Sequence, residues 1–175
     1  NKPNFDNGIH LTLTCEWEKY KFGPVLPATE VPSLVDKDGF FHKSKADFYA
    51  NALAKDVKKE LEAQIEKALK FGLQPTHIDS HMHTVGMRPE FLKIYRDLGV
   101  KYNLAVLLNK ELVNTTDFDN ASYQFEDDLL VDSIYFGNFT DFEKGELKEY
   151  YEKALDNLKP GFNVVLIHPA FDDHE

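Results

Sequence analysis

The segment Pro75-Thr76-His77-Ile78-Asp79-Ser80-His81 decides the fold class, because it has the pattern of a short strand set between two helices. Before it, apolar residues recur at three- and four-residue spacing from Lys45 to Phe71, which predicts one long helix that Gly72 ends. After it, a second helix is predicted from Pro89 to about Leu98, with Gly99 at its end. The segment therefore takes the place of a strand in a β/α alternation.

Three more strands are predicted around this centre. Gly8 to Thr14 alternates apolar and polar residues, whereas Leu104 to Leu108 and Val164 to Ile167 are continuous apolar runs. A third helix is predicted from a capping box at Thr140-Asp141-Phe142-Glu143 through Leu158, and residues 109 to 138 show no clear period. Strands that alternate with crossover helices predict an α/β fold with a parallel sheet. Because four strands are too few to close a barrel, any barrel would contain this chain as one part.

The bulk composition limits the classes of function. The 175 residues, 42% of them hydrophobic, suit a single catalytic domain over residues 1 to 175. Thirty acidic against twenty basic residues give a net charge of -10 without a basic stripe, so nucleic acid is not an expected partner. No apolar run reaches the roughly 18 to 20 residues that span a bilayer. The single cysteine, Cys15, suits a reducing compartment, and the predicted location is the cytoplasm.

Three of the seven histidines gather in one short stretch, at positions His77, His81 and His83, with Asp79 among them. The period of a strand sets His77, Asp79 and His81 on one face. Neutral imidazole binds divalent first-row metals well, and a neighbouring carboxylate can orient it through a hydrogen bond. The cluster therefore predicts a divalent metal site. The alternative is a set of ordinary polar residues at a strand end and on an exposed loop.

Two further histidines lie at other predicted strands. His10 belongs to the polar face of the first strand, and His168 follows the last one. Parallel α/β folds gather their chemistry at the carboxyl ends of the strands, which is where His81 and His168 fall. An imidazole with the ordinary pKa near 6.5 can donate a proton at neutral pH, so His168 is a candidate general acid. Taken alone, His10 is more often a half-buried structural histidine than a ligand, and the alternative for His168 is a plain residue at the end of a strand.

Residues 15 to 44 form a loop rich in Pro, Gly and aromatic residues that is longer than a routine connection. Trp17, Tyr20 and Phe22 could stack on a sugar ring, because aromatic faces match the apolar faces of pyranoses, or they could pack in the core. The sequence has neither a Gly-x-Ser-x-Gly nucleophile motif nor a phosphate-binding Gly-rich loop. A metal-activated water is then the natural nucleophile for a hydrolase.

Taken in order, these motifs resemble those of a known family. They are Gly8-Ile9-His10-Leu11-Thr12-Leu13-Thr14, Val31-Pro32-Ser33-Leu34-Val35-Asp36-Lys37-Asp38-Gly39-Phe40, Pro75-Thr76-His77-Ile78-Asp79-Ser80-His81-Met82-His83 and Ile167-His168-Pro169-Ala170. The chain is similar through them to the YdjC-like carbohydrate deacetylases, which include chitooligosaccharide deacetylases. The resemblance implies a distorted (β/α) barrel, a divalent metal ion, and removal of N-acetyl groups from amino sugars or chitooligosaccharides.

The resemblance also implies roles for individual residues. His10 and His81 correspond to two metal ligands of Mg²⁺ or Zn²⁺, Asp79 to a residue that supports them, and His168 to the catalytic acid. The family's acidic ligand comes from an Asn-Ala-Asp-Asp-x-Gly motif on an earlier strand, which this sequence does not contain. We therefore expect a fragment that is incomplete at both ends.

Two other functions remain open on the sequence. A metal-dependent phosphoesterase or amidohydrolase also uses clustered His and Asp residues, usually with more ligands for a two-metal centre. A non-catalytic carbohydrate-binding relative would keep the pocket without the chemistry. The expected partner of the chain is a small carbohydrate substrate. A homodimer is compatible with the sequence, which does not determine the oligomeric state.

Overall fold

The computed structural model of the chain describes residues 6–109, 129–137, 143 and 145–168. The chain divides into two compact units, one reaching to Leu108 and the other formed mainly by the residues from Leu130 onward. The single catalytic domain stays a prediction. Within the described residues, no helix combines the length and the apolar character that crossing a membrane requires.

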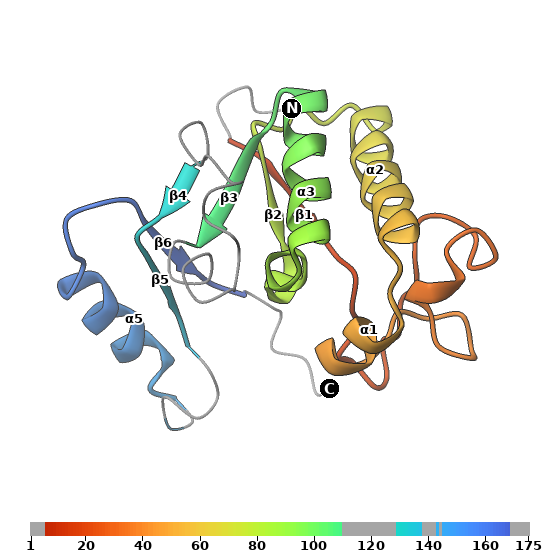
Figure 1. The fold of residues 1–175 in the computed structure, drawn as a ribbon. Coiled ribbons are helices and arrows are strands. Elements are labelled where there is room, and N and C mark those ends of the chain that lie inside the picture. Colours follow the sequence, from red (N-terminus) through yellow and green to blue (C-terminus); the bar gives the residue numbers. More distant parts are fainter. Residues whose placement is uncertain (1–5, 110–128, 138–142, 144, 169–175) are drawn as a thin grey trace. The chain divides into compact units, whose positions relative to one another are not determined.

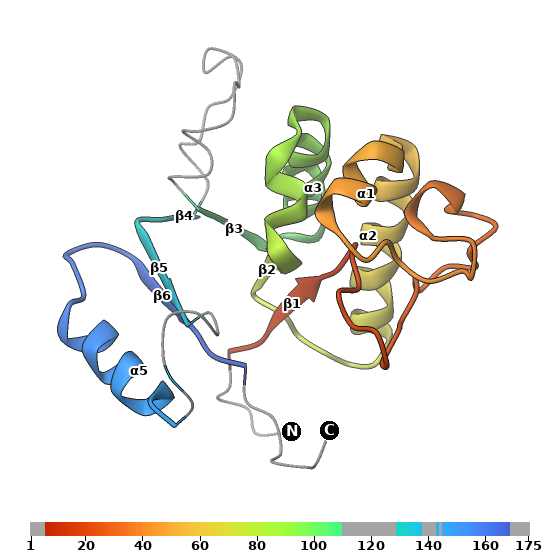
Figure 2. The ribbon, with the colours of Figure 1, turned by 90° about the horizontal axis from the view of Figure 1, so that it is seen from below.

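The first unit is built on three parallel strands. Strands β1 (Gly8–Leu11), β2 (His77–Ser80) and β3 (Ala105–Asn109) lie side by side in this order. Helices α1 (Lys45–Asn51), α2 (Ala54–Lys70) and α3 (Pro89–Tyr102) connect them, with two short 3-10 helices at Pro32–Leu34 and His81–Met87. Helix α3 runs along one face of the sheet with α2 beside it (Figures 1 and 2). The parallel sheet and its crossover helices confirm the predicted fold class.

The core of this unit lies between the strands and the helices α2 and α3. Its fully or almost fully buried apolar side chains include Leu11, Leu61, Ile65, Ile78, Phe91, Tyr95 and Leu98. Helix α3 packs closely on β3 at Gly99. A Cβ atom on this residue would come within 2.2 Å of Val106 Cγ2. Gly99 lies inside α3, which continues to Tyr102, so the predicted helix end at Gly99 is wrong. The helix ends at Tyr102, where Asn103 takes a left-handed conformation with φ 53°.

The predicted single helix from Lys45 to Phe71 is two helices. Ala52 and Leu53 are extended, with ψ values of 131° and 136°, so that α1 ends and α2 begins there. The Leu53 N–H donates to Ser33 Oγ (3.0 Å), and the Asp56 carboxylate accepts from the Ser33 hydroxyl (2.7 Å). Ser33, from the preceding loop, thus supplies an acceptor for the Leu53 N–H in place of a helical carbonyl.

The buried side of α2 holds the long loop of residues 15 to 44. Glu60, which is fully buried, accepts hydrogen bonds from the backbone N–H groups of Val25 (2.8 Å) and Leu26 (3.2 Å). One turn further on, the Gln64 amide accepts from the Thr12 N–H (2.9 Å) and donates to the Thr12 carbonyl (2.8 Å). Polar side chains of α2 therefore fix both the loop and the chain that leaves β1.

In the second unit, strands β5 (Ser133–Phe136) and β6 (Asn163–Leu166) pair in parallel and α5 (Leu147–Asp156) connects them. A short strand β4 (Leu129–Val131) precedes β5. The sequence did not predict β4 or β5. It also placed the start of α5 at residues 140–143, of which 140–142 lie outside the described residues. Glu143 and Gly145 are not helical, and Gly145 has φ 99°, so the helix begins later than predicted.

Candidate functional site

Strands β1 and β2 place His10 beside Asp79. The two residues are directly opposite each other in the parallel register, and Gly8 is likewise opposite His77. His10 Nδ1 lies 2.6 Å from Asp79 Oδ2. This hydrogen bond raises the pKa of His10 above its ordinary value, against the opposing effect of burial. Half of the His10 side chain (52%) is exposed, so the residue is accessible to solvent.

His81 reaches the same place from the turn that follows β2. Its Nδ1 lies 3.1 Å from His10 Nε2, and the two rings are nearly perpendicular with their centres 5.2 Å apart. On its other side, His81 Nε2 lies 2.8 Å from Glu16 Oε2. We call His10 and His81 the histidine pair. In each ring, one nitrogen thus faces the other histidine and the second nitrogen faces a carboxylate.

The two carboxylates fix which ring nitrogens carry hydrogen. An ionised carboxylate can only accept a hydrogen bond, so His10 Nδ1 and His81 Nε2 must be the donors. In neutral rings, the facing nitrogens His10 Nε2 and His81 Nδ1 are then both lone-pair acceptors, 3.1 Å apart. Two lone pairs at this distance repel each other unless a cation lies between them. That cation can be a proton or a metal ion.

The histidine pair fits two ligands of one metal ion. With metal to nitrogen distances of 2.0 to 2.1 Å, two imidazoles at octahedral or tetrahedral angles have nitrogens about 2.8 to 3.4 Å apart. The facing nitrogens of the histidine pair are 3.1 Å apart. The carboxylates behind the rings are the partners that metal-bound histidines commonly have. Across the part of the chain that the structure describes, no group of three or more His, Cys, Asp or Glu side chains is arranged to hold a metal ion.

Glu16 is a site residue that the sequence did not predict. Besides its contact with His81, it accepts a hydrogen bond from the hydroxyl of Thr14 (2.6 Å), which is fully buried. Burial opposes ionisation of Glu16, but the hydrogen bonds from His81 and Thr14 outweigh it and lower the pKa of this carboxyl group. The alternation that places His10, Thr12 and Thr14 on one face reaches Glu16 at its next step. This two-residue alternation was the feature of the sequence that could have pointed to Glu16.

Among the contacts described, the other histidines of the cluster form no hydrogen bond with the histidine pair. The His77 ring fills the space where a side chain on Gly8 would lie, and its Nδ1 is 3.0 Å from Thr76 Oγ1. His83 is half-buried, and its pKa is lowered by burial and by the charge of Lys45. It lies near enough to Asp79 and His10 for their charges to act on it as well. Of the four cluster residues, Asp79 and His81 are thus the two with a described hydrogen-bond contact to His10.

Comparison with known proteins identifies the family of the chain. The family model described as YdjC-like protein matches residues 1–175. The chain belongs to the YdjC-like family. It is 30% identical over 172 residues to the carbohydrate deacetylase of Geobacillus stearothermophilus, which covers 98% of this chain and 60% of that protein. It is 38% identical over 107 residues to the carbohydrate deacetylase of Thermus thermophilus, which covers 61% of this chain and 39% of that protein.

A solved structure has a similar fold. A crystal structure from Enterococcus faecalis V583, described as a candidate cellobiose-phosphate cleavage protein, matches 98% of this YdjC-like chain with a TM-score of 0.74 and 28% identity. The match covers 62% of that protein. The chain thus spans less than two thirds of the length of each of these relatives.

The remaining predicted residues of the YdjC-like chain lie in two places. His168 is exposed and follows β6 in the second unit, and its predicted role as the acid stays a prediction. Trp17 and Tyr20, in the first unit, are 62% and 58% exposed. Phe22 packs edge to face against Phe41, with 6.3 Å between ring centres. Of the three aromatic residues considered for sugar stacking, Phe22 therefore takes part in packing.

Proposed function

We propose that this YdjC-like chain belongs to a carbohydrate deacetylase that removes N-acetyl groups from amino sugars or chitooligosaccharides and holds one divalent metal ion through His10 and His81. One observation carries the proposal: two lone-pair nitrogens face each other at 3.1 Å, and a carboxylate holds each ring from behind. The names of the relatives from Geobacillus stearothermophilus and Thermus thermophilus support the reaction class.

The residues of the chain would divide the work of amide hydrolysis. When bound, the metal ion supplies Lewis acidity toward the acetyl carbonyl and lowers the pKa of a water molecule. His10 and His81 would be its nitrogen ligands, while Asp79 and Glu16 keep the rings in the tautomers that aim their lone pairs at it. His168 would protonate the departing sugar amine. Nitrogen ligands favour Zn²⁺, whereas an additional acidic ligand would also suit Mg²⁺.

Acetate release from acetylated chitooligosaccharides by the full-length protein tests the function. We expect release by the wild type, and a loss of about 100-fold or more after His168→Ala, because general acid catalysis typically contributes this much. The bound metal should stay at the wild-type level in this variant, because His168 is not proposed as a ligand. Undiminished acetate release by His168→Ala would exclude the assigned acid, and no release by the wild type would exclude the deacetylase.

A sugar phosphoesterase is the second candidate, and the description of the Enterococcus faecalis structure as a candidate cellobiose-phosphate cleavage protein favours it. Such enzymes commonly use two metal ions, so metal content and the released product separate the two candidates. About one ion per chain and release of acetate support the deacetylase. Release of phosphate from phosphorylated disaccharides would support the phosphoesterase. Sugar binding with neither product would indicate a non-catalytic carbohydrate-binding relative.

Replacement of Glu16 should weaken metal binding without removing a ligand. Because partners of metal-bound histidines typically change affinity by about 10- to 100-fold, we expect a loss of this size for Glu16→Ala in a Zn²⁺ competition titration. Glu18→Ala is the matched control, since Glu18 lies two residues further on and forms an exposed ion pair with Lys43. The Zn²⁺ affinity of Glu18→Ala should equal that of the wild type. Equal affinities in both variants would show that Glu16 does not orient His81.

A further inference from the structure

The turn that presents His81 has an unfavourable backbone conformation. Met82 (φ 53°, ψ 17°) and His83 (φ 54°, ψ 31°) are both left-handed within the segment His81–Met87. Side chains of L-residues disfavour this region, and two successive residues seldom adopt it. Met82 is 43% exposed, so its own side chain does little to hold the turn. Contacts from elsewhere must therefore stabilise this conformation.

Thr84 holds the turn from its C-terminal side. This residue is fully buried, and its hydroxyl donates to the His81 carbonyl (3.1 Å) and lies 3.3 Å from Ser80 Oγ. Its backbone carbonyl accepts a hydrogen bond from the hydroxyl of Tyr49 (2.7 Å). The side chain of Thr84 thus closes the turn on itself, while its carbonyl fixes the turn to helix α1.

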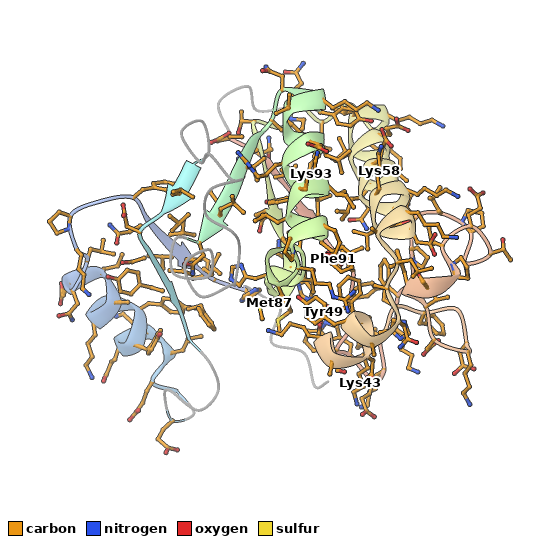
Figure 3. The ribbon with its side chains drawn as sticks, in the orientation of Figure 1. Lys43, Tyr49, Lys58, Met87, Phe91 and Lys93 are labelled. Carbon is orange, nitrogen blue, oxygen red and sulfur yellow. The ribbon has the colours of Figure 1, made fainter. Side chains whose placement is uncertain are left out.

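Tyr49 contacts the far end of the same segment as well. Its backbone carbonyl accepts a hydrogen bond from the guanidinium of Arg88, which directly follows the segment. The same guanidinium lies over the rings of Tyr49 (5.7 Å) and Phe91 (5.3 Å). Figure 3 shows Tyr49, Phe91 and Met87 gathered where α1 meets the start of α3. Burial raises the pKa of the Tyr49 hydroxyl, so this group stays protonated and able to donate.

We propose that Tyr49 is a positioning residue for the histidine pair. By holding the Thr84 carbonyl, its hydroxyl keeps Met82 and His83 left-handed, and this conformation sets the direction of the His81 ring toward His10 and Glu16. The conformational part of the proposal concerns the metal-free protein. Only its effect on metal affinity rests on the proposed function.

A second tyrosine provides a matched comparison. The hydroxyl of Tyr95 also donates to a backbone carbonyl at 2.7 Å, that of Ile78 in β2. Strand β2 is paired on both sides, with β1 and with β3, so its backbone does not depend on this one hydrogen bond. Tyr49→Phe and Tyr95→Phe each remove one such hydroxyl group. Only Tyr49→Phe releases the left-handed turn.

The direct test is ¹⁵N NMR of the histidine rings in the metal-free full-length protein, at a pH where His81 is neutral. In the wild type and in Tyr95→Phe, we expect the His81 signals of one tautomer with hydrogen on Nε2. In Tyr49→Phe, we expect averaging of the two tautomers, because His81 is no longer held against Glu16. A single, unchanged tautomer in Tyr49→Phe would overturn the proposal, whatever its thermal stability.

Zn²⁺ titration of the same variants measures the consequence for binding. We expect about tenfold weaker affinity in Tyr49→Phe, at the lower end of the effect of residues that orient metal ligands, and wild-type affinity in Tyr95→Phe. Adding Met82→Asn should restore most of the loss, since Asn tolerates the left-handed region. Equal losses in both tyrosine variants, or no rescue, would contradict the role of the turn. Absence of Zn²⁺ binding in the wild type would instead contradict the proposed function and leave the NMR result to decide on Tyr49.

Discussion

Replacement of His81 by alanine is expected to lower acetate release by the full-length protein about 1000-fold or more, because several kcal/mol of metal-dependent stabilisation would be lost. The facing nitrogens of His10 and His81 are 3.1 Å apart, and removal of one leaves a single imidazole ligand in the described part of the site. The purified variant should therefore also contain less metal than the wild type. Metal analysis and acetate assay of the same preparations measure both effects.

His77→Ala is the control for this prediction. His77 belongs to the same histidine cluster in the sequence, but its ring lies against Gly8 and is bonded to Thr76. We expect its metal content and acetate release to remain close to those of the wild type. If His77→Ala were as inactive as His81→Ala, the assignment of the ligand to His81 would be wrong. Retention of full activity by His81→Ala would exclude the histidine pair as the metal site.

The second large effect is expected on stability, from Glu60→Ala. Removal of this buried carboxylate leaves the backbone N–H groups of Val25 and Leu26 without their acceptor and the Gln64 amide without one of its partners. At about 1 kcal/mol or more for each of the three lost hydrogen bonds, the free energy of unfolding should fall by about 3 kcal/mol or more. Urea unfolding followed by circular dichroism measures this change.

Glu66→Ala is the matched control on the same helix. Glu66 is exposed and bonds only the Tyr102 hydroxyl among the contacts described, so its removal should cost less than about 0.5 kcal/mol. The loss of unfolding free energy in Glu60→Gln should lie between those of Glu60→Ala and Glu66→Ala, since an amide keeps one acceptor oxygen. A Glu60→Ala protein as stable as Glu66→Ala would mean that water replaces the carboxylate and that α2 does not anchor the loop.

The sequence predicted those elements whose pattern is local. Strands β1, β2, β3 and β6 are alternating or apolar runs, and each lies where it was expected. Strands β4 and β5 are three and four residues long, separated only by Asp132, and such short runs show no usable period. The break at Ala52 and Leu53 depends on Ser33, which is distant in sequence. The apolar spacing continues across the break, so it does not indicate that Ser33 interrupts the helix there.

The same distinction applies to the site. His10, Asp79 and His81 were predicted from motifs and from their place at strand ends, and the structure brings them together. Glu16 was missed because it lies after Leu11, where the strand that carries His10 ends, and outside the motifs that drew attention to the histidines. Tyr49 gave no signal at all, since it acts on a backbone carbonyl. Residues that orient others through the backbone are the hardest to find in one sequence.

The Gln64 side chain, from helix α2, forms the two hydrogen bonds with the Thr12 backbone that a neighbouring strand would otherwise form. The Gln64 amide presents an N–H donor and a carbonyl acceptor to Thr12, as an adjacent peptide unit would, and its amide nitrogen also donates to Glu60. The ladder of β1 therefore stops at Leu11, and the residues after it can turn away toward Glu16. This amide therefore satisfies both backbone groups of Thr12 at the point where the strand has ended.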